Sequence, residues 1–358
     1  MLNKLSIENF RNIVSMSLPL SNGVTAFTGE NGAGKTSILD AIHLLGTGKP
    51  FSTHRIDNVI NREAEAVQVV GHMTNPSKLV LGVRRNRGGS GEARVGGAPV
   101  KALSELAKAM PVVVINADAL NIVRDGPEGR RRFIDAFVFH VEQSFAQTSR
   151  RYMHALKQRN ALLRERRGSD DSVWAHDLAA VGELLVSSRA RAVAALSDSL
   201  KDVLIDMQVT LPEWQLVQRC GWAEGWSLAD ALAGAAASDR QRGFTQVGPH
   251  RGDVIFLVEG LPAHEVLSRG QMKVLMAATK LAQARVIQRE TGVSPLLLVD
   301  DVAAELDAEN AAGLFRNMVS DGFQVLATMV DASGPSAWTQ NALSNVFHVE
   351  HGAITDAN

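Results

Sequence analysis

The hydrophobic positions of this sequence follow two different periods. Near both ends, apolar and polar residues alternate as in half-buried β-strands or form the short continuous runs of buried strands. Residues 67–72 and 79–84 alternate, whereas 23–28, 111–115 and 296–299 are buried-strand runs. From 136 to 242 the pattern is mainly helical, with one strand-like interruption at 208–211 and 215–218. We therefore predict an α/β domain split along the chain, at 1–135 and 243–358, with a mainly helical second domain inserted at 136–242.

A glycine-rich segment follows the first buried strand and precedes helically spaced apolar residues. Strand, loop and helix come in the order that a phosphate-binding loop requires. Its residues are Gly29, Glu30, Asn31, Gly32, Ala33, Gly34, Lys35 and Thr36. Glycines let main-chain N–H groups wrap a triphosphate closely. Lys35 would contact the β- and γ-phosphates, and the Thr36 hydroxyl would hold Mg²⁺. ATP and Mg²⁺ are therefore the expected cofactors.

Two adjacent carboxylates end the buried run at 296–299. Parallel strands of an α/β sheet present such residues at their carboxyl edge, where ligands bind. Asp300 is expected to hold the Mg²⁺ ion and its water shell, and Asp301 to orient the attacking water. We expect Lys35, Asp300 and Asp301 to form the catalytic set.

Composition narrows the class of protein. The 358 residues are 45% apolar, carry a formal net charge of −1 and include a single cysteine, Cys220, so no disulfide framework is expected. No apolar run approaches the ~18 residues of a membrane span. We expect a cytoplasmic location, no membrane partner, and contacts with polyanions only through local basic patches.

One such patch lies in the first helical stretch. Residues 124–167 contain eleven Lys or Arg against five Asp or Glu. A solubilising helix face and a DNA-phosphate surface both fit this excess. The candidate DNA-binding residues are Arg150, Arg151, Lys157, Arg159 and Arg164. The basic segment 84–89 is predicted as a loop tip, either solvated or functional.

Several segments together resemble a known family. The phosphate loop, the segment Leu267 to Gln271, the acidic strand end and Glu305-Leu306-Asp307 resemble the ATPase heads related to ABC proteins, in their chromosome-maintenance branch. More narrowly, the chain resembles the RecF family of bacterial DNA repair and recombination proteins. The segments that carry this narrower likeness are 9–12, 127–135, 157–160, 248–251 and 267–271.

The resemblance implies a fold, partners and further site residues. The fold would be an ABC/SMC-type P-loop ATPase head, with mixed and antiparallel sheets around the phosphate-loop helix. In such heads the serine of the signature segment, here Ser268, completes the nucleotide site of a second protomer and so joins Lys35, Asp300 and Asp301 in the expected catalytic set, which makes ATP the link of a homodimer. Arg11 and Asn12 would approach the nucleotide, Asn116 or Asp118 would stand in a sensing loop, and Asp307 would cross the dimer interface. His250 would either reach the nucleotide or cap a turn.

Two positions depart from the wider family. Asp301 stands where glutamate is usual and is one methylene shorter, which predicts slow turnover. Thr328 stands where a histidine is usual. The expected function is an ATP-dependent DNA-binding protein of replication-linked recombinational repair and SOS induction. Its dimer would clamp gapped DNA, help recombinase loading with recombination mediator proteins, and hydrolyse ATP weakly with DNA stimulation. The alternatives are a nucleotide-binding subunit of another ABC-type assembly such as a transporter, a small-molecule kinase, and a structural chromosome tether.

Overall fold

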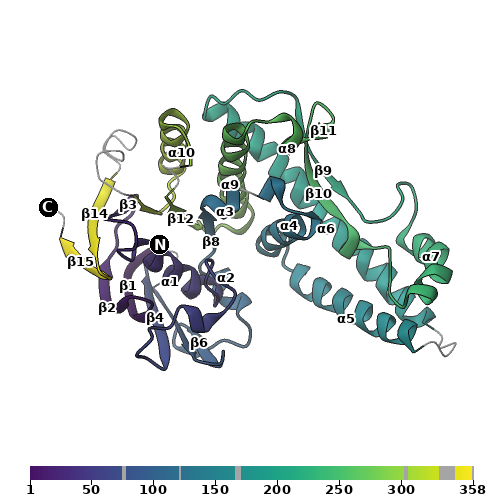
Figure 1. Cartoon of the computed structure of the whole chain (residues 1–358), viewed down its shortest axis with the longest axis horizontal. Coiled ribbons are helices and arrows are strands. Elements are labelled where there is room, and N and C mark those ends of the chain that lie inside the picture. Colours follow the sequence, from purple (N-terminus) through teal and green to yellow (C-terminus); the bar gives the residue numbers. More distant parts are fainter. Residues whose placement is uncertain (75–77, 121, 166–170, 302–304, 330–342, 357–358) are drawn as a thin grey trace. The chain divides into compact units, whose positions relative to one another are not determined.

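The chain forms two compact units. The computed structural model describes residues 1–74, 78–120, 122–165, 171–301, 305–329 and 343–356 (Figure 1). Unit 1 comprises Met1–Leu120, Asp202–Thr210 and Lys273–Asn358, and unit 2 comprises Asn121–Lys201 and Leu211–Met272. Each unit has its own sheets and is described by itself.

Unit 1 contains an antiparallel sheet built from the N-terminal part of the chain. Its strand order is β2-β1-β4-β5-β6-β7. The alternation predicted at 67–72 and 79–84 is confirmed, and Val95 pairs with Ala98 across the expected two-glycine hairpin. The strands are β1 (Leu2–Phe10), β2 (Ile13–Pro19), β4 (Ala66–Met73), β5 (Leu79–Asn86), β6 (Gly91–Val95) and β7 (Ala98–Pro99).

The second sheet of unit 1 is mostly parallel and carries the predicted site segments. Its order is β15-β14-β3-β13-β12-β8, and only the β14–β15 pair is antiparallel. The three buried-strand runs of the sequence therefore lie in one sheet. The strands are β3 (Val24–Thr28), β8 (Val112–Ile115), β12 (Leu296–Asp300), β13 (Val325–Thr328), β14 (Leu343–Glu350) and β15 (Ala353–Asp356).

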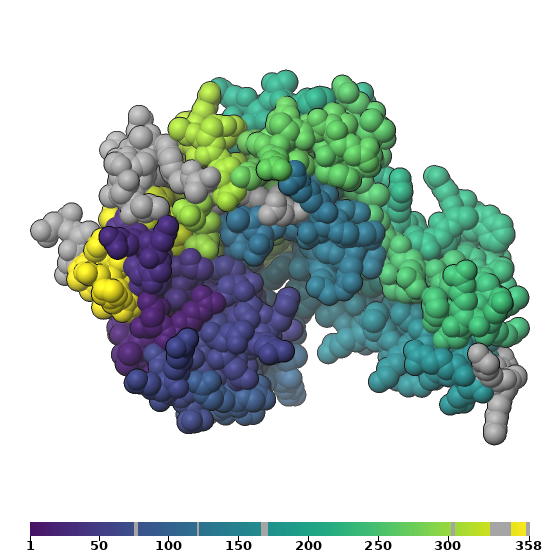
Figure 2. Space-filling model, viewed as in Figure 1, coloured from purple at the N-terminus to yellow at the C-terminus, as the bar shows by residue number. Residues whose placement is uncertain are grey.

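The helix after the phosphate loop packs between these two sheets. Helix α1 (Lys35–Thr47) buries ten of its residues. Ile38 and Leu45 of α1, Ile7 of β1, Val69 of β4 and Leu298 of β12 belong to one core cluster. In Figure 2 the yellow atoms of the C-terminal hairpin lie against the purple atoms of the N-terminal strands. The other helices of unit 1 are η1 (Ile56–Asn58), α2 (Ser104–Ala109), α3 (Ala117–Leu120) and α10 (Ala308–Ser320).

Unit 2 is mainly helical around a small sheet. Strand β10 (Asp253–Val258) pairs with β9 (Trp214–Arg219) and β11 (Leu261–Pro262), all antiparallel. Its helices are η2 (Ile122–Arg124), α4 (Pro127–Val141), α5 (Phe145–Arg164), α7 (Leu228–Arg242), η3 (Pro249–Arg251) and α8 (Ala263–Val266). Two long helices, α6 (Ser172–Asp206) and α9 (Arg269–Thr291), contain residues of both units.

The bounds of unit 2 differ from the predicted insertion at 136–242. The unit also takes 121–135 and 243–272, because β10 pairs with β9 and Arg130 of α4 forms a two-point ion pair with Asp253. The strand-like reading of 208–211 was wrong, since the strand starts at Trp214. None of the helices within the described ranges combines the length and hydrophobicity that a membrane crossing requires.

Candidate nucleotide-binding site

The phosphate loop lies where the sequence predicted it, between β3 and α1. Gly29 and Gly34 have φ angles of 135° and 116°, which residues with a side chain rarely adopt. A Cβ on Gly29 would lie 2.3 Å from the carbonyl oxygen of Val349, and one on Gly34 would lie 2.8 Å from Nδ2 of Asn12. Glycine is therefore required at both positions to keep the loop in this conformation.

Lys35 is held over the loop by main-chain acceptors. Its Nζ donates to the carbonyl oxygens of Gly29 at 2.6 Å and of Glu30 at 2.9 Å. Desolvation lowers the pKa of this ammonium, and the nearby carboxylates of Asp301 and Asp300 partly oppose that effect. Anionic phosphate oxygens accept stronger hydrogen bonds than neutral carbonyls do. The lysine can therefore transfer its donors to a phosphate without leaving the loop.

Two residues predicted to hold Mg²⁺ are in direct contact. Thr36 Oγ1 donates to Asp300 Oδ1 at 2.9 Å, although the residues are 264 positions apart. A second hydroxyl, from Thr328 at the end of β13, donates to the same carboxylate oxygen at 2.7 Å. Mg²⁺ binds oxygen ligands and often uses one carboxylate together with substrate phosphates and water. The Thr36 and Asp300 oxygens therefore fit this ion.

Asp301 lies at the same sheet edge in an unusual backbone conformation. Its φ is 52°, and its main-chain N–H donates to Thr328 Oγ1 at 2.9 Å. Desolvation raises the pKa of its carboxyl, the negative charge of Asp300 raises it further, and Lys35 acts in the opposite direction. A raised pKa makes this carboxylate a stronger base than an ordinary aspartate.

The turn between β1 and β2 holds the phosphate loop through side-chain hydrogen bonds. Asn12 Nδ2 donates to the carbonyl oxygen of Ala33 at 3.0 Å, and Ser37 Oγ donates to Asn12 Oδ1 at 3.3 Å. Arg11, whose φ is 50°, forms an ion pair with Asp40 at 3.2 Å and also contacts Ser52. The side chain of Asp40 is fully buried in α1. Both predicted residues therefore lie at the loop or its helix.

The C-terminal hairpin forms a further wall beside the loop. The N–H of Gly352 donates to the carbonyl oxygen of Ala33 at 2.8 Å. Between this hairpin and the loop lies a hollow of about 390 Å³, lined by residues 30–33 and 348–351. Nothing in the sequence pattern connected these two segments, because they meet only through tertiary packing.

The sensing-loop candidates follow β8 at the same edge. Ile115 pairs with Val299, so the next residue, Asn116, lies beside Asp300 in strand register. Its Oδ1 accepts from the N–H of Ala119 at 2.8 Å and thereby caps α3. Asp118 is exposed on that short helix.

The two residues expected to contact a second protomer, Ser268 and Asp307, each lie at the start of a helix. Ser268, which belongs to unit 2, precedes α9; its Oγ accepts from the N–H of Gln271 at 3.2 Å, and Gln271 Oε1 accepts from the N–H of Ser268 at 2.9 Å. This reciprocal pair is a capping box. Asp307 caps α10 by accepting from the N–H of Asn310 at 2.9 Å, which lowers the pKa of its carboxyl. Residues 302–304 lie outside the described part of the chain.

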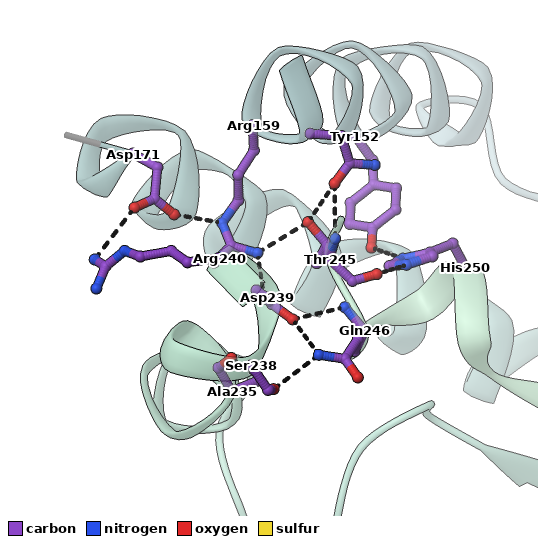
Figure 3. A network of polar contacts seen from close by, with 11 residues as sticks. Tyr152, Arg159, Asp171, Ala235, Ser238, Asp239, Arg240, Thr245, Gln246 and His250 are labelled. Atoms are coloured by element: carbon purple, nitrogen blue, oxygen red, sulfur yellow. Dashed lines mark hydrogen bonds and ion pairs between the residues drawn. The ribbon is translucent and has the colours of Figure 1, made fainter. Parts of the chain in front are cut away.

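One predicted DNA-binding residue is corrected by the structure. Arg159 is 1% exposed, and its guanidinium contacts Asp171 at 2.9 Å and Asp239 at 2.7 Å. Figure 3 shows it at the centre of a buried polar network in unit 2. Arg159 therefore stabilises the fold and cannot reach DNA. Arg150, Lys157 and Arg164 of α5 are exposed, and Arg151 forms an ion pair with Asp177.

The two readings of His250 are also decided by this network. Its Nε2 lies 3.1 Å from the carbonyl oxygen of Thr245, which can only accept, so Nε2 carries the proton. Its Nδ1 then accepts from the hydroxyl of Tyr152 at 2.7 Å. Burial lowers the pKa of His250 to about 4. His250 is a structural residue of unit 2.

Comparison with known proteins decides the family. The family model described as RecF/RecN/SMC N terminal domain matches residues 1–355. The DNA replication and repair protein RecF of Shewanella piezotolerans is 35% identical over 365 residues, and that of Chromohalobacter salexigens is 36% identical over 357 residues; each alignment covers 99% of both chains. The chain belongs to the RecF family. RecF relatives carry the name of DNA replication and repair proteins.

Solved structures support the fold of this RecF family member. A structure described as the recombination mediator protein RecF-ATP in the RecFOR pathway matches with a TM-score of 0.88 at 23% identity, covering 100% of this chain and 97% of that one. An Smc head bound to the C-winged helix domain of ScpA matches with a TM-score of 0.58 at 16% identity, covering 99% and 96%. The predicted ABC/SMC-type head fold is confirmed.

Proposed function

We propose that this protein is an ATP-dependent DNA-binding protein of replication-linked recombinational repair. The observation that carries the proposal is the contact of Thr36 with Asp300, which joins the phosphate loop to the acidic strand end at 2.9 Å. Membership of the RecF family and the names of its relatives support the link to DNA replication and repair. ATP and Mg²⁺ are the proposed cofactors, and the cytoplasm is the proposed location.

The residues of unit 1 support nucleotide hydrolysis with divided roles. Main-chain N–H groups of the loop and the ammonium of Lys35 bind and orient the phosphates. When bound, Mg²⁺ would neutralise charge on the phosphate oxygens from its place at Thr36 and Asp300. Asp301 holds the attacking water and takes up its proton, a role that its raised pKa favours. Because an aspartate reaches less far than the usual glutamate, we propose that turnover is slow. We also propose that DNA stimulates this weak hydrolysis.

The proposed switch is an ATP-dependent homodimer in which Ser268 of each copy reaches the phosphates bound to the other. Ser268, Arg269 and Gly270 are exposed at the start of α9. A helix start with N–H donors and a hydroxyl attracts a γ-phosphate. Loss of that phosphate would remove the contact that favours the dimer. Asp307, exposed at the start of α10, is the proposed second contact across the interface.

DNA, including gapped duplexes, is the proposed macromolecular ligand, and recombination mediator proteins are the proposed partners. On α5, Lys157 and Arg164 are the best placed of the predicted residues because they are exposed. Arg150 and Arg151 remain secondary candidates, since the first donates from Nε to the carbonyl oxygen of Ala146 and the second pairs with Asp177.

The decisive experiment measures ATP-driven dimerisation by analytical ultracentrifugation of the full chain with ATP and Mg²⁺. Lys35→Arg and Ser268→Arg should both stay monomeric, the first because the phosphate contact is altered and the second because a bulky side chain blocks the partner's phosphate. Circular dichroism checks that both variants are folded.

Two control variants separate the effect of a bulky side chain at position 268 from the effect of losing the helix-capping hydroxyl. Ser268→Ala loses the same capping hydroxyl but adds no bulk, so it should dimerise better than Ser268→Arg. Ser15→Arg places arginine on the exposed face of β2 and should dimerise as the wild type does. Normal dimerisation by Lys35→Arg or Ser268→Arg would exclude the shared site.

A further inference from the structure

Unit 1 has a second hollow, lined by other residues than the phosphate loop. It has a volume of about 450 Å³ and begins at Gly48, directly after α1. Its wall includes Lys49, His54 and Arg85, which come from the segment after α1 and from strand β5. We call it the basic groove.

The charge of the basic groove is unbalanced. Lys49 and His54 are exposed, and within the described part of the chain neither they nor Arg85 forms an ion pair. None of the lining residues is an Asp or a Glu. The nearby Asp57 does not line the groove, and its carboxylate accepts from the N–H of Gly88 at 2.9 Å. A partner with negative charge would therefore meet no opposing carboxylate on the groove wall.

Arg85 shows why such a partner would be favoured. Desolvation lowers the pKa of its guanidinium, and its Nη2 donates to the carbonyl oxygen of Gly48 at 3.3 Å. A partly desolvated cation whose hydrogen-bond partner is neutral gains strongly from an anion, since charge-assisted hydrogen bonds are the stronger class. A phosphate oxygen is a suitable acceptor for the guanidinium fork.

We propose that the basic groove binds the sugar-phosphate backbone of DNA. This inference rests on the proposed function and names a surface for it that is distinct from α5. The cations come from separate segments and line an open hollow much larger than one phosphate, which favours successive phosphates over a single small anion. The sequence placed Arg85 in a basic loop tip at 84–89, but it lies on β5, and the groove gives it a role there.

The cations of the basic groove are less occupied by carboxylates than those of α5. On α5, Arg159 is buried between two carboxylates and Arg151 is paired with Asp177. A cation already neutralised by a carboxylate contributes less to phosphate binding, because that ion pair must first be broken. The groove cations have no such partner among the residues that the structure describes.

The groove is also anchored to the phosphate-loop helix. Asp40 of α1 accepts from the N–H of Phe51 at 2.6 Å and of Ser52 at 3.4 Å. These bonds fix the chain between Lys49 and His54. Lys49 and His54 are thus carried by a segment attached to the helix that begins at Lys35, whereas Arg85 comes from β5.

The test is the salt dependence of DNA binding by the full chain with ATP and Mg²⁺. Fluorescence anisotropy with a labelled gapped duplex, between about 50 and 200 mM salt, gives the slope of log K against log salt. Lys49→Ala/Arg85→Ala removes two phosphate contacts and should flatten this slope by about 1.8. The single variant Lys49→Glu, at an exposed position, should weaken binding without affecting the fold.

The matched control is Arg94→Ala/Lys108→Ala, which removes two exposed cations of the same unit outside the groove. It should keep the wild-type slope. Affinity for a fluorescent ATP analogue should be the same for all variants. A wild-type slope for Lys49→Ala/Arg85→Ala, while the wild type itself binds DNA, overturns the groove and leaves the proposed function standing.

Two other outcomes are also informative. A wild type that binds no DNA with ATP and Mg²⁺ would overturn the proposed function, and the groove assignment with it. Labelled poly-glutamate that binds the wild type and is weakened by Lys49→Ala/Arg85→Ala, while the duplex keeps its wild-type slope, would assign the groove to an acidic protein segment instead of DNA.

Discussion

Arg159 in unit 2 and Lys35 in unit 1 are both buried cations, but their partners differ. Arg159 is held by two carboxylates and by the hydroxyl of Thr245 at 2.9 Å. Lys35 contacts two neutral main-chain carbonyls. A cation with two carboxylate partners is committed to the fold, whereas one held by carbonyls can still bind an anion. In this protein the partner, and not the residue type or the burial, separates structural from ligand-binding cations.

The largest effect that would test this comparison is expected for Arg159→Met. Removing the cation leaves the buried carboxylate of Asp239 without its guanidinium partner and leaves Asp171 with the exposed Arg240 at 3.6 Å, which should lower the free energy of unfolding by about 3–5 kcal/mol. Urea unfolding followed by tryptophan fluorescence measures it well, since four of the five tryptophans, Trp174, Trp214, Trp222 and Trp226, lie in unit 2. Lys157→Met, on an exposed part of the same helix, should change the value by less than about 0.5 kcal/mol. Equal effects of the two substitutions would contradict the structural role of Arg159.

An intermediate effect, on catalysis, is expected for Thr328→Val. The hydroxyl of Thr328 donates to Asp300 and accepts from the N–H of Asp301, so its loss should misorient both carboxylates. We expect kcat for ATP hydrolysis to fall about 10- to 100-fold, with a smaller change in ATP affinity. Thr25→Val is the matched control, because Thr25 lies on β3 of the same sheet and its buried hydroxyl has no hydrogen-bond partner among the described residues. An unchanged kcat for Thr328→Val would remove this residue from the site.

The smallest effect is expected for the stability of Asp301→Asn. The folded state holds the Asp301 proton more tightly than the unfolded chain, so ionisation above the raised pKa destabilises the fold. The amide removes this cost, and the variant should melt slightly above the wild type at neutral pH. The difference should vanish as pH falls below the ordinary value of 3.8, where the wild-type carboxyl is protonated in both states. Thermal melts at several pH values measure it, with the exposed Asp118→Asn as control. A higher melting temperature that persists at low pH would point to a cause other than charge.

The sequence predicted the arrangement of the phosphate loop and the acidic strand end because both patterns are local. The loop needs glycines and a lysine at fixed spacing, and the acids follow a run of buried residues, so both can be recognised without tertiary information. The contact between Thr36 and Asp300 then follows from parallel strands ending at one edge. The sequence did not predict that Thr328 connects Asp300 and Asp301 through hydrogen bonds; it showed Thr328 only as a departure from the family pattern.

Prediction from the sequence failed where contacts between residues far apart in the chain determine the role of a side chain or the extent of a unit. Arg159 counted as one of several positive charges on a helix, but its partner Asp239 lies 80 positions away and is invisible to a charge count. Asp40 was missed too, although a carboxylate among the buried residues of α1 is a usable signal of a buried polar contact. The extent of unit 2 could not be predicted either, since it depends on the pairing of β9 with β10.

The backbone contacts of the C-terminal hairpin have a consequence for how the protein is made. Thr28, at the entrance to the phosphate loop, donates at 3.4 Å to the carbonyl oxygen of Phe347, 319 residues later, and Gly29 and Ala33 pack against Val349 and Gly352. While the chain is emerging from the ribosome, the loop is synthesised early but lacks this support until the hairpin follows. The nascent protein would therefore become able to bind nucleotide only late in translation, after both units have been synthesised.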